Sequence, residues 1–364
     1  MSFLEKIKAS IDAFLVDMQK PSLQQKATFF RLLAVSQKAW LGIRASLVSL
    51  QQWESHKGML MILEGMIQKL TVGASLAEAM DHHSHFFESD EIELVRSTEI
   101  TGNLAQTLED VADNLESTQD INQRVKKAMT YPALVILFTI VAVVVLLIFV
   151  MPTIIDMYDS LDKLPWITQF MLDVSDFLKE NWFMLLVGVS GAVVLYQMLY
   201  KHLLVFKMTI DAMLLRVPLV KDVVKLFYMA RFTALLWQFY EAGVSPVISF
   251  KLLSNIFDNF TYKRKMIDIK NSVVAGFSIY ESMEGDDLFD PILIQIIHVG
   301  ENTGSLTDVL KKISVYYTTT LKHSIDSLMA VIEPILMAFV ACIVGTLLGA
   351  IYIPMADMVN VIGG

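Results

Sequence analysis

Three stretches of the chain contain no charged residue and have the length of a membrane-spanning helix. They are residues 133–151, 182–200 and 335–353. A helix of about nineteen residues rises roughly 28 Å, close to the thickness of the hydrocarbon core of a bilayer. The pattern therefore predicts three transmembrane helices, separated by polar regions that lie outside the membrane.

The segments that lead into the first and the third apolar stretch share a pattern. A glutamate, a glycine, a leucine and two prolines recur in the same order, 202 residues apart. They are Glu99, Gly102, Leu104, Pro132 and Pro152 in the first copy, and Glu301, Gly304, Leu306, Pro334 and Pro354 in the second. The prolines mark the membrane boundaries. Five matches in one register indicate an internal repeat, in which a soluble module leads into a membrane helix.

Both polar regions have the pattern of short helices. The capping-box form, a serine followed three residues later by glutamine or glutamate, occurs at 22–25, 75–78 and 278–281 and is typical of helix N-termini. A long helix then runs to the membrane over 103–130 and over 305–332, and no segment alternates as a strand would. We predict an all-α, polytopic membrane protein with three transmembrane helices and two homologous helical-bundle modules.

Four regions follow from this organisation. They are 1–128 (an N-terminal amphipathic helix and the first module), 129–200 (two transmembrane helices and the 152–180 connection), 201–332 (the second module) and 333–364 (the last transmembrane helix and a short tail). The apolar residues of the N-terminal helix recur at spacings of three and four. We expect this helix to pack against its own domain or a partner, with the membrane surface as the alternative.

Flanking charge sets the orientation of the membrane helices. Arg124, Lys126 and Lys127 precede the first apolar stretch and five basic residues follow the second, whereas 152–180 carries six acidic residues against two lysines. Short basic loops stay on the cytoplasmic side. The N-terminus and both modules should therefore be cytoplasmic, while 152–180 and the C-terminal tail face outward.

Composition and absent motifs narrow the function. Hydrophobic residues make up 54% of the chain and charged residues 18%, which fits a membrane protein with sizeable soluble parts. The net charge of −9 argues against a nucleic-acid partner, and the single cysteine, Cys342, excludes an internal disulfide. The P-loop, nucleophile-elbow and His-Glu-x-x-His patterns are missing, so we predict no catalytic and no cofactor-binding residue.

Two groups of polar residues in the modules remain as candidates. His82, His83 and His85 lie in a polar loop that the second copy does not preserve, so we interpret them as solvated, with opportunistic metal binding as the alternative. Glu99 and Glu301 each stand three residues before a corner glycine. We expect them to pin the corner by accepting hydrogen bonds, or to form part of a docking surface.

Two further features belong to the last membrane helix. Glu333 lies at its cytoplasmic edge, where it is an anchor at headgroup level or, alternatively, a buried carboxylate that couples movements. Ala341, Gly345 and Gly349 are four residues apart on one face and favour close helix packing, within or between subunits.

These residues together resemble the inner-membrane platform proteins of type II secretion and type IV pilus assembly, the GspF/PilC family. The resemblance covers residues 25–354. It is carried by the sequences VGENTGSL at 299–306, AMTYP at 128–132, Met-Pro at 151–152, LPWIT at 164–168, and Arg231-Phe232 leading into EAGVSP at 241–246. Thr98 departs from the family, which usually has glycine there. The chain is also shorter than most secretion members, which favours a pilus system.

The resemblance implies a non-catalytic platform in the bacterial inner membrane, with its C-terminus in the periplasm. Its modules would dock on a hexameric assembly ATPase, and its membrane helices would contact the apolar stem of a pilin or pseudopilin as it enters the growing fibre. Other inner-membrane assembly proteins, further copies of the chain and membrane lipid are the remaining expected partners.

Three other classes of protein compete with this interpretation. A transporter would need ionisable residues or broken helices inside the membrane. A membrane-tethered signalling protein would need a larger outer domain than 152–180, and a membrane enzyme would need a convergent polar cluster. The sequence favours none of the three.

Overall fold

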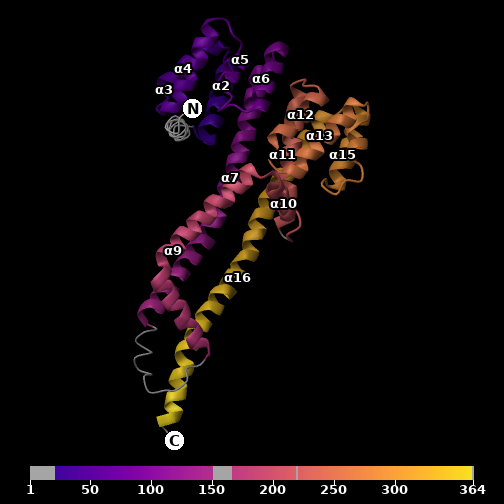
Figure 1. The fold of residues 1–364 in the computed structure, drawn as a ribbon. Helices are drawn as coiled ribbons and strands as arrows, with labels where there is room; N and C mark the ends of the chain where they lie inside the picture. The colour runs from indigo at the N-terminus through magenta and orange to yellow at the C-terminus, as the bar shows by residue number, and fades with distance from the viewer. Residues whose placement is uncertain (1–20, 151–165, 219, 363–364) are drawn as a thin grey trace. The chain divides into compact units, whose positions relative to one another are not determined.

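The computed structural model describes residues 21–150, 166–218 and 220–362, and within these ranges it contains helices and no strand (Figure 1). The all-α prediction is confirmed. The predicted N-terminal helix and the boundary residue Pro152 lie outside the described residues. Packing divides the chain into a soluble unit, Met1–Gln123 with Asp211–Lys322, and a membrane unit, Arg124–Ile210 with His323–Gly364.

The soluble unit contains two modules of five helices each. The helices of the first module are α2 (Leu23–Lys38), α3 (Ile43–Trp53), α4 (Lys57–Thr71), α5 (Leu76–Asp81) and α6 (Ser89–Thr101). Those of the second module are α11 (Val220–Glu241), α12 (Pro246–Ile256), α13 (Phe260–Val274), α14 (Ile279–Met283) and α15 (Pro291–Thr303). α10 (Leu204–Leu214) precedes the second module.

The two modules correspond helix by helix, so the repeat extends well beyond the five residues that revealed it. α3 and α12 both have 11 residues, α4 and α13 both have 15, and α6 and α15 both have 13. The three predicted capping boxes are present at Ser22, Ser75 and Ser278. Each module is followed by a long helix, α7 (Leu104–Val145) or α16 (Leu306–Ile362).

An aromatic core holds each module together. In the first, the rings of Phe29 and Phe30 pack against Phe87 with centroids 5.6 and 5.9 Å away. In the second, Tyr228 stacks on Tyr262 with a centroid distance of 4.2 Å. Large buried rings contribute most to the burial of apolar surface, so these clusters fix the short helices around them.

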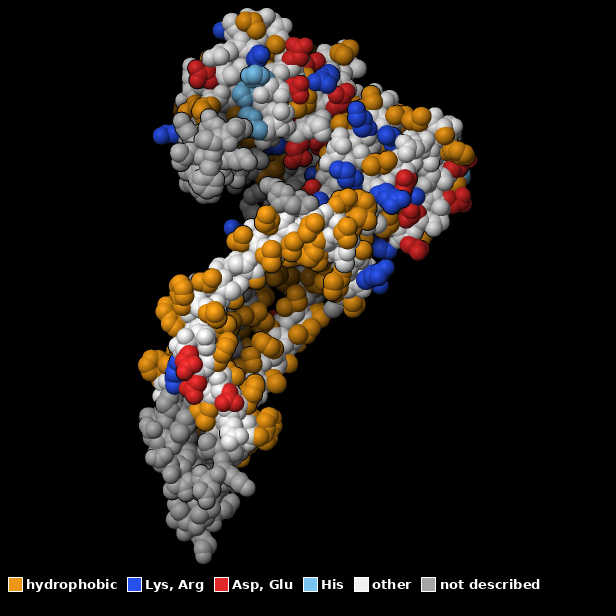
Figure 2. Space-filling model, viewed as in Figure 1, with side chains coloured by type: hydrophobic (Ala, Val, Ile, Leu, Met, Phe, Trp, Pro, Cys, Tyr) orange, Lys and Arg blue, Asp and Glu red, His pale blue; other side chains and the backbone are white. Residues whose placement is uncertain are grey.

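The membrane unit contains the part of α7 from Arg124 onward, the π-helical turn η1 (Leu146–Val150) that follows it, α9 (Trp166–His202) and the apolar part of α16. α7 with η1 and α16 are long and apolar enough to cross a membrane, and α9 is a third span if its two halves, bent by 48°, are counted together. Only 6% and 11% of the apolar windows of the first two are buried. Figure 2 accordingly shows hydrophobic side chains gathered over α9 and α16.

α9 begins sixteen residues before the predicted second span, since Trp166 precedes residue 182 by that number. Its first half packs on the two other membrane helices. The Thr168 hydroxyl donates to the carbonyl of Ala350 (3.0 Å), and the Ser175 hydroxyl donates to the carbonyl of Leu147 (2.7 Å), in the π turn. Residues 166–180 are therefore helical and pack on both other membrane helices.

The boundary prolines lie inside continuous helices. Pro132 falls within α7, and Pro334 and Pro354 fall within the bounds of α16. A proline has no N–H, so the carbonyls four residues earlier, those of Ala128 and Ala330, lose an intrahelical partner. Such carbonyls are tolerated at a membrane surface, where water and headgroups can donate to them. The two long helices thus pass from soluble module to membrane without a break.

Candidate functional site

The two corner glutamates each cap a different helix of their module. The Glu99 carboxylate accepts hydrogen bonds from the Leu76 and Ala77 amides at 2.6 and 3.0 Å, at the start of α5. The Glu301 carboxylate accepts from the Ile279 and Tyr280 amides at 2.8 and 2.9 Å, at the start of α14.

These bonds complete the N-terminus of two very short helices. Ser75 and Ser278 accept from the third amide of α5 and α14, at 3.1 Å in each case. The carboxylate and the hydroxyl together satisfy the amides that have no partner within the helix. Both carboxylates are half-buried, and their oxygens are occupied by these contacts. The geometry is that of a structural pin at the corner and offers no acid–base pair.

The corner glycines end the preceding helices. Gly102 and Gly304 have φ of 81° and 67°, a left-handed conformation that glycine adopts without strain. The two modules differ at a further glycine, Gly300. A Cβ placed on Gly300 would lie 3.0 Å from the Leu306 Cα, whereas the equivalent residue of the first module is the buried Thr98. The corner of the second module is therefore the tighter one.

The histidine loop of the first module packs against α4. A Cβ placed on Gly65 would lie 2.4 Å from the His83 ring nitrogen Nε2. Burial lowers the pKa of His83, and the neighbouring His82 and His85 lower it further. In the described part of the chain, no group of three or more His, Cys, Asp or Glu side chains is arranged to hold a metal ion.

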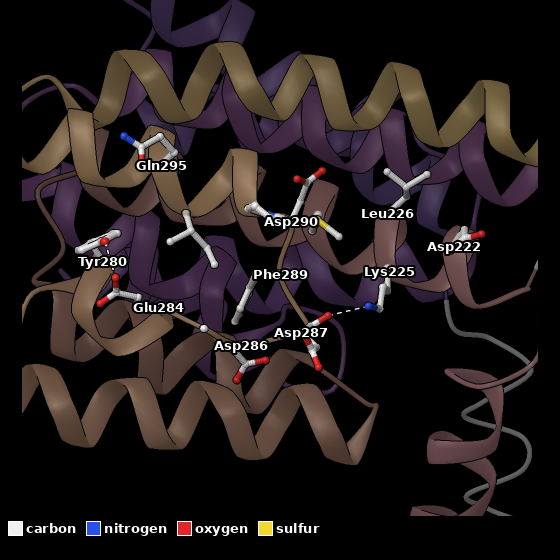
Figure 3. Close-up of a pocket in the computed structure, with 14 residues that line it drawn as sticks. Asp222, Lys225, Leu226, Tyr280, Glu284, Asp286, Asp287, Phe289, Asp290 and Gln295 are labelled. Atoms are coloured by element: carbon white, nitrogen blue, oxygen red, sulfur yellow. Dashed lines mark hydrogen bonds between the residues drawn. The ribbon is translucent and has the colours of Figure 1, made fainter.

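The matching loop of the second module borders a cleft of about 610 Å³ (Figure 3). α11, the loop after α14 and the start of α15 form its walls, and Leu226 and Phe289 contribute apolar surface. Five carboxylates line it: Asp222, Glu284, Asp286, Asp287 and Asp290. Lys225 Nζ donates to the Asp287 carbonyl at 2.6 Å, and the Tyr280 hydroxyl donates to Glu284 at 2.7 Å. The first module has histidines where this cleft has acids.

Arg231 lies where the two modules meet. Its guanidinium is 3.8 Å from the carboxylate of Glu88, the residue that caps α6. Nearby, the Gln238 side-chain amide donates to the carbonyl of Asp110 at 2.8 Å. Residues of α6 and α12 line a second cleft, of about 550 Å³. Arg231, which the sequence offers as a structural or docking candidate, thus contacts the first module; no local pattern indicated Glu88 as its partner.

Buried acids beside this contact were also missed by the sequence analysis. Lys26 Nζ lies 3.0 and 3.1 Å from the two carboxylate oxygens of Glu91, and both residues are buried. Burial raises the pKa of Asp90 to about 6, with Glu88 adding to the effect and Arg231 opposing it. Burial likewise raises the pKa of Asp110 to about 6. The pairing of Lys26 with Glu91 spans 65 residues, which explains why no motif revealed it.

The long helices meet at equivalent positions of the repeat. Lys322 lies 2.8 Å from Asp120, and Arg124 lies 3.6 Å from Asp326. Each pair joins positions 202 residues apart, so each residue contacts its own counterpart in the other copy. This is the arrangement found at a two-fold axis. The two copies carry opposite charges at both positions.

The predicted residues of the last membrane helix face outward. Glu333, Ala341 and Gly345 are exposed, and a Cβ placed on Gly345 would meet nothing within 4 Å. Gly349 is half-buried and lies close only to its own helix, at Ile353. Within the described residues, the small-residue face is therefore not covered by another helix at Gly345.

The sequence is similar to proteins of fibre assembly and secretion. It is 29% identical over 338 residues to the type IV pilus assembly protein PilC of Pseudomonas aeruginosa, covering 93% of this chain and 90% of that protein. It is 30% identical to the type IV pilus assembly protein TapC of Aeromonas hydrophila (80% and 71% covered) and 28% identical to the type II secretion system protein F of Xanthomonas campestris (80% and 72% covered).

A family model matches the chain twice, over residues 29–152 and 232–354, and its description is type II secretion system protein F. Each match contains most of one module and the membrane helix that follows it, which agrees with the internal repeat. The predicted resemblance to the GspF/PilC family is confirmed. Since the two matches together cover more than half of its length, this chain belongs to the family of type II secretion system protein F.

Proposed function

We propose that this protein is a non-catalytic platform of the bacterial inner membrane. It couples a cytoplasmic assembly ATPase to the insertion of pilin subunits into a type IV pilus, or of pseudopilins in a related secretion machine. The observation that carries the proposal is the continuity of α7 and α16, which begin at a pinned corner of each module and run into the apolar windows. An unbroken helix can pass a displacement from the modules to the membrane.

The corners support a mechanical role for the modules. Glu99 and Glu301 are occupied by backbone amides, which favours the structural interpretation of these residues over the docking one. Arg231 contacts Glu88 of the first module, and Gln238 bonds to α7, so that a load applied to one module would reach the other. The ATPase would then meet one composite surface built from 1–128 and 201–332.

The membrane unit supports contact with other apolar helices. Only 6% and 11% of its two apolar windows are buried, and nothing lies within 4 Å of a Cβ placed on Gly345. A pilin stem, further copies of this chain, other assembly proteins and lipid would cover these surfaces. The N-terminus and both modules would be cytoplasmic and the C-terminus periplasmic, in agreement with the basic residues around Arg124.

Site-specific photocrosslinking in intact cells tests this function. The photoreactive residue would replace Ile100 in the first module, Phe277 in the second, or Val141 and Val344 in the membrane helices, all of which are exposed. The buried Leu147 provides the control. Module positions should capture an assembly ATPase, and membrane positions a pilin-like protein.

Two results would contradict the proposal. One is capture of neither partner in cells that visibly assemble fibres. The other is ATP hydrolysis by the purified protein at a rate comparable with that of a dedicated ATPase, because a platform has no catalytic site of its own.

A further inference from the structure

A groove crosses the first module where α2, α3 and α4 meet. Its volume is about 320 Å³, and every described residue that lines it belongs to these helices or their caps. Buried apolar side chains form its floor and more exposed ones its walls; these are Phe29, Met59 and Leu63, then Leu32, Leu50 and Trp53. Trp53 is 88% exposed and Leu32 is 44% exposed, so the described part of the chain leaves this apolar surface uncovered.

The polar residues of the groove already have local partners. Ser22 and Gln25 bond to each other in the capping box of α2. The Thr28 hydroxyl donates to a carbonyl of its own helix at 2.9 Å, and the Glu54 carboxylate accepts from the next two backbone amides at 2.8 Å. The groove therefore offers mainly apolar surface to a ligand, with an exposed tryptophan of the kind that dominates binding at protein interfaces.

The N-terminal segment, residues 1–20, carries a matching apolar stripe. Projected on a helix, five of its apolar residues fall within about 80° of one another; they are Leu4, Ile7, Ile11, Phe14 and Met18. The charged residues of the segment, three acids and three lysines, all lie outside this arc. A helix on a membrane surface is typically rich in basic residues on its polar face, so the even charge balance favours a protein groove over lipid.

The N-terminal segment joins the described chain at the groove itself. Only Pro21 stands between Lys20 and Ser22, and Ser22 is both the N-cap of α2 and a lining residue of the groove. A residue before proline is disfavoured in a helical conformation, so a helix within 1–20 would end before Pro21. A segment tethered by so few residues has an effective concentration on the order of millimolar at the groove.

The length of the segment suits the groove. Along α2 the lining residues extend from Ser22 to Leu32, roughly 15 Å at the rise of a helix. A helix that folds back from the proline over the same distance reaches about as far as Ile11 and includes Phe14 and Met18. Two antiparallel helices joined by a short loop are a common unit of helical proteins, and this arrangement would lay the stripe along the groove.

We propose that the N-terminal segment folds back over α2 and that Ile11, Phe14 and Met18 fill the groove between α2, α3 and α4. The tether favours this segment over a second copy or a separate protein, because either would need a free concentration on the order of millimolar to compete. Trp53 is then covered. On this side of the first module, an assembly partner would meet the charged face of the segment.

Photocrosslinking of the full-length protein in native membranes tests this placement. A benzophenone amino acid would replace Trp53, and mass spectrometry would identify the crosslinked residues in a mixture of isotope-labelled and unlabelled protein. Val72, which is 81% exposed at the C-cap of α4, is the matched control. Position 53 should crosslink to the stretch around Phe14 of the same chain, and position 72 should not.

Four results would overturn the proposal. Crosslinked peptides of mixed isotope content would place a second copy in the groove, capture of another protein would place a partner there, and capture of lipid would place the membrane there. Equal crosslinking of positions 53 and 72 to the N-terminal segment would mean that the segment has no preference for the groove.

Thiol labelling gives a measurement that does not depend on the crosslinker. In a Cys342→Ser background, Leu32→Cys would report access to the groove wall and Val72→Cys access elsewhere in the module. With an intrinsic dissociation constant of about 0.1 mM, the tether gives about tenfold protection. Ile11→Lys combined with Phe14→Lys should therefore speed labelling at position 32 about tenfold and leave position 72 unchanged. An unchanged rate at position 32 would overturn the proposal.

Discussion

The first module buries charged side chains between its helices, whereas helices α11–α15 of the second bury only uncharged polar groups among the described residues. Lys26, Asp90 and Glu91 are all less than 7% exposed. Thr233, Gln238 and Ser249 are among the buried polar residues of the second module. The two modules nevertheless have the same succession of helices. The helix pattern therefore does not depend on interior electrostatics. The charged features that both modules retain lie at helix ends, and the corner carboxylates of Glu99 and Glu301 are among them.

Removal of the corner carboxylates should have the largest effect on both modules. Glu99→Ala leaves two amides of α5 without their acceptor, and Glu301→Ala does the same to α14. The loss of two charge-assisted bonds should cost about 2–3 kcal/mol in local stability. Hydrogen exchange by mass spectrometry should then be roughly 30- to 150-fold faster in α5 or α14.

Glu93→Ala is the matched control, because its carboxylate pairs only with Arg96, in an exposed i,i+3 contact. It should leave exchange in α5 unchanged. If Glu99→Ala and Glu301→Ala behaved like this control, the carboxylates would not be structural pins, and the docking interpretation of both residues would regain support.

A methyl group at Gly300 should distinguish the corners of the two modules. The added Cβ would lie 3.0 Å from the Leu306 backbone, which cannot easily move, so Gly300→Ala should cost about 1–3 kcal/mol. Thermal unfolding of the purified protein in detergent should shift down by a few degrees. Gly42→Ala is the control, since its φ is −59° and nothing lies within 4 Å of the new Cβ. Equal midpoints for the two variants would mean that the corner is not tightly packed.

Asp90 should give the first module a pH dependence that is absent from Asp90→Asn. Its pKa is about 6 in the folded protein and near 3.8 in the unfolded chain, so the unfolded chain loses this proton at lower pH. The contribution of Asp90 to stability therefore falls as the pH rises from about 4 to about 6. Above pH 6 the asparagine variant should be more stable than the wild type by up to about 3 kcal/mol.

The measurement is the difference in unfolding midpoint between wild type and variant from pH 4.5 to pH 7.5. The difference should grow with pH and then level off. Asp268→Asn, at an exposed position of the second module, is the control for the same substitution outside the first module. A flat profile for Asp90→Asn would show that this side chain does not titrate in the range.

The sequence predicted the features that neighbouring residues determine. Capping boxes, corner glycines and apolar stretches act over three to twenty residues, and all of them appear in the structure. The pairing of Lys26 with Glu91 and of Arg231 with Glu88 depends on how distant helices pack, which no local spacing encodes.

The early start of α9 did have a local signal. Ile167, Met171, Val174 and Leu178 recur at spacings of four, three and four, the pattern of an amphipathic helix, and all four pack against the Leu147 cluster. The charged residues of 152–180 predict on which side of the membrane this segment lies, whereas its apolar spacing indicates which face of α9 packs against the other membrane helices.

The smallest expected effect concerns the ion pairs between the two copies of the internal repeat. Asp120 meets Lys322, and Arg124 meets Asp326, across equivalent positions. If the first copies of two different chains paired in the same way, Asp120 would face Asp120 and Arg124 would face Arg124, and like charges would repel. Divergence of charge at these positions therefore favours pairing within the chain.

Asp120→Lys and Lys322→Asp should each lower the free energy of unfolding by about 0.5–1 kcal/mol, because the pair is partly exposed. The double variant should recover most of this loss, because the two reversed charges attract again. Unfolding midpoints of the wild type, the two single variants and the double variant form a double-mutant cycle that measures this interaction energy. Additive losses would mean that the two helices are matched by apolar packing and that the opposite charges are incidental.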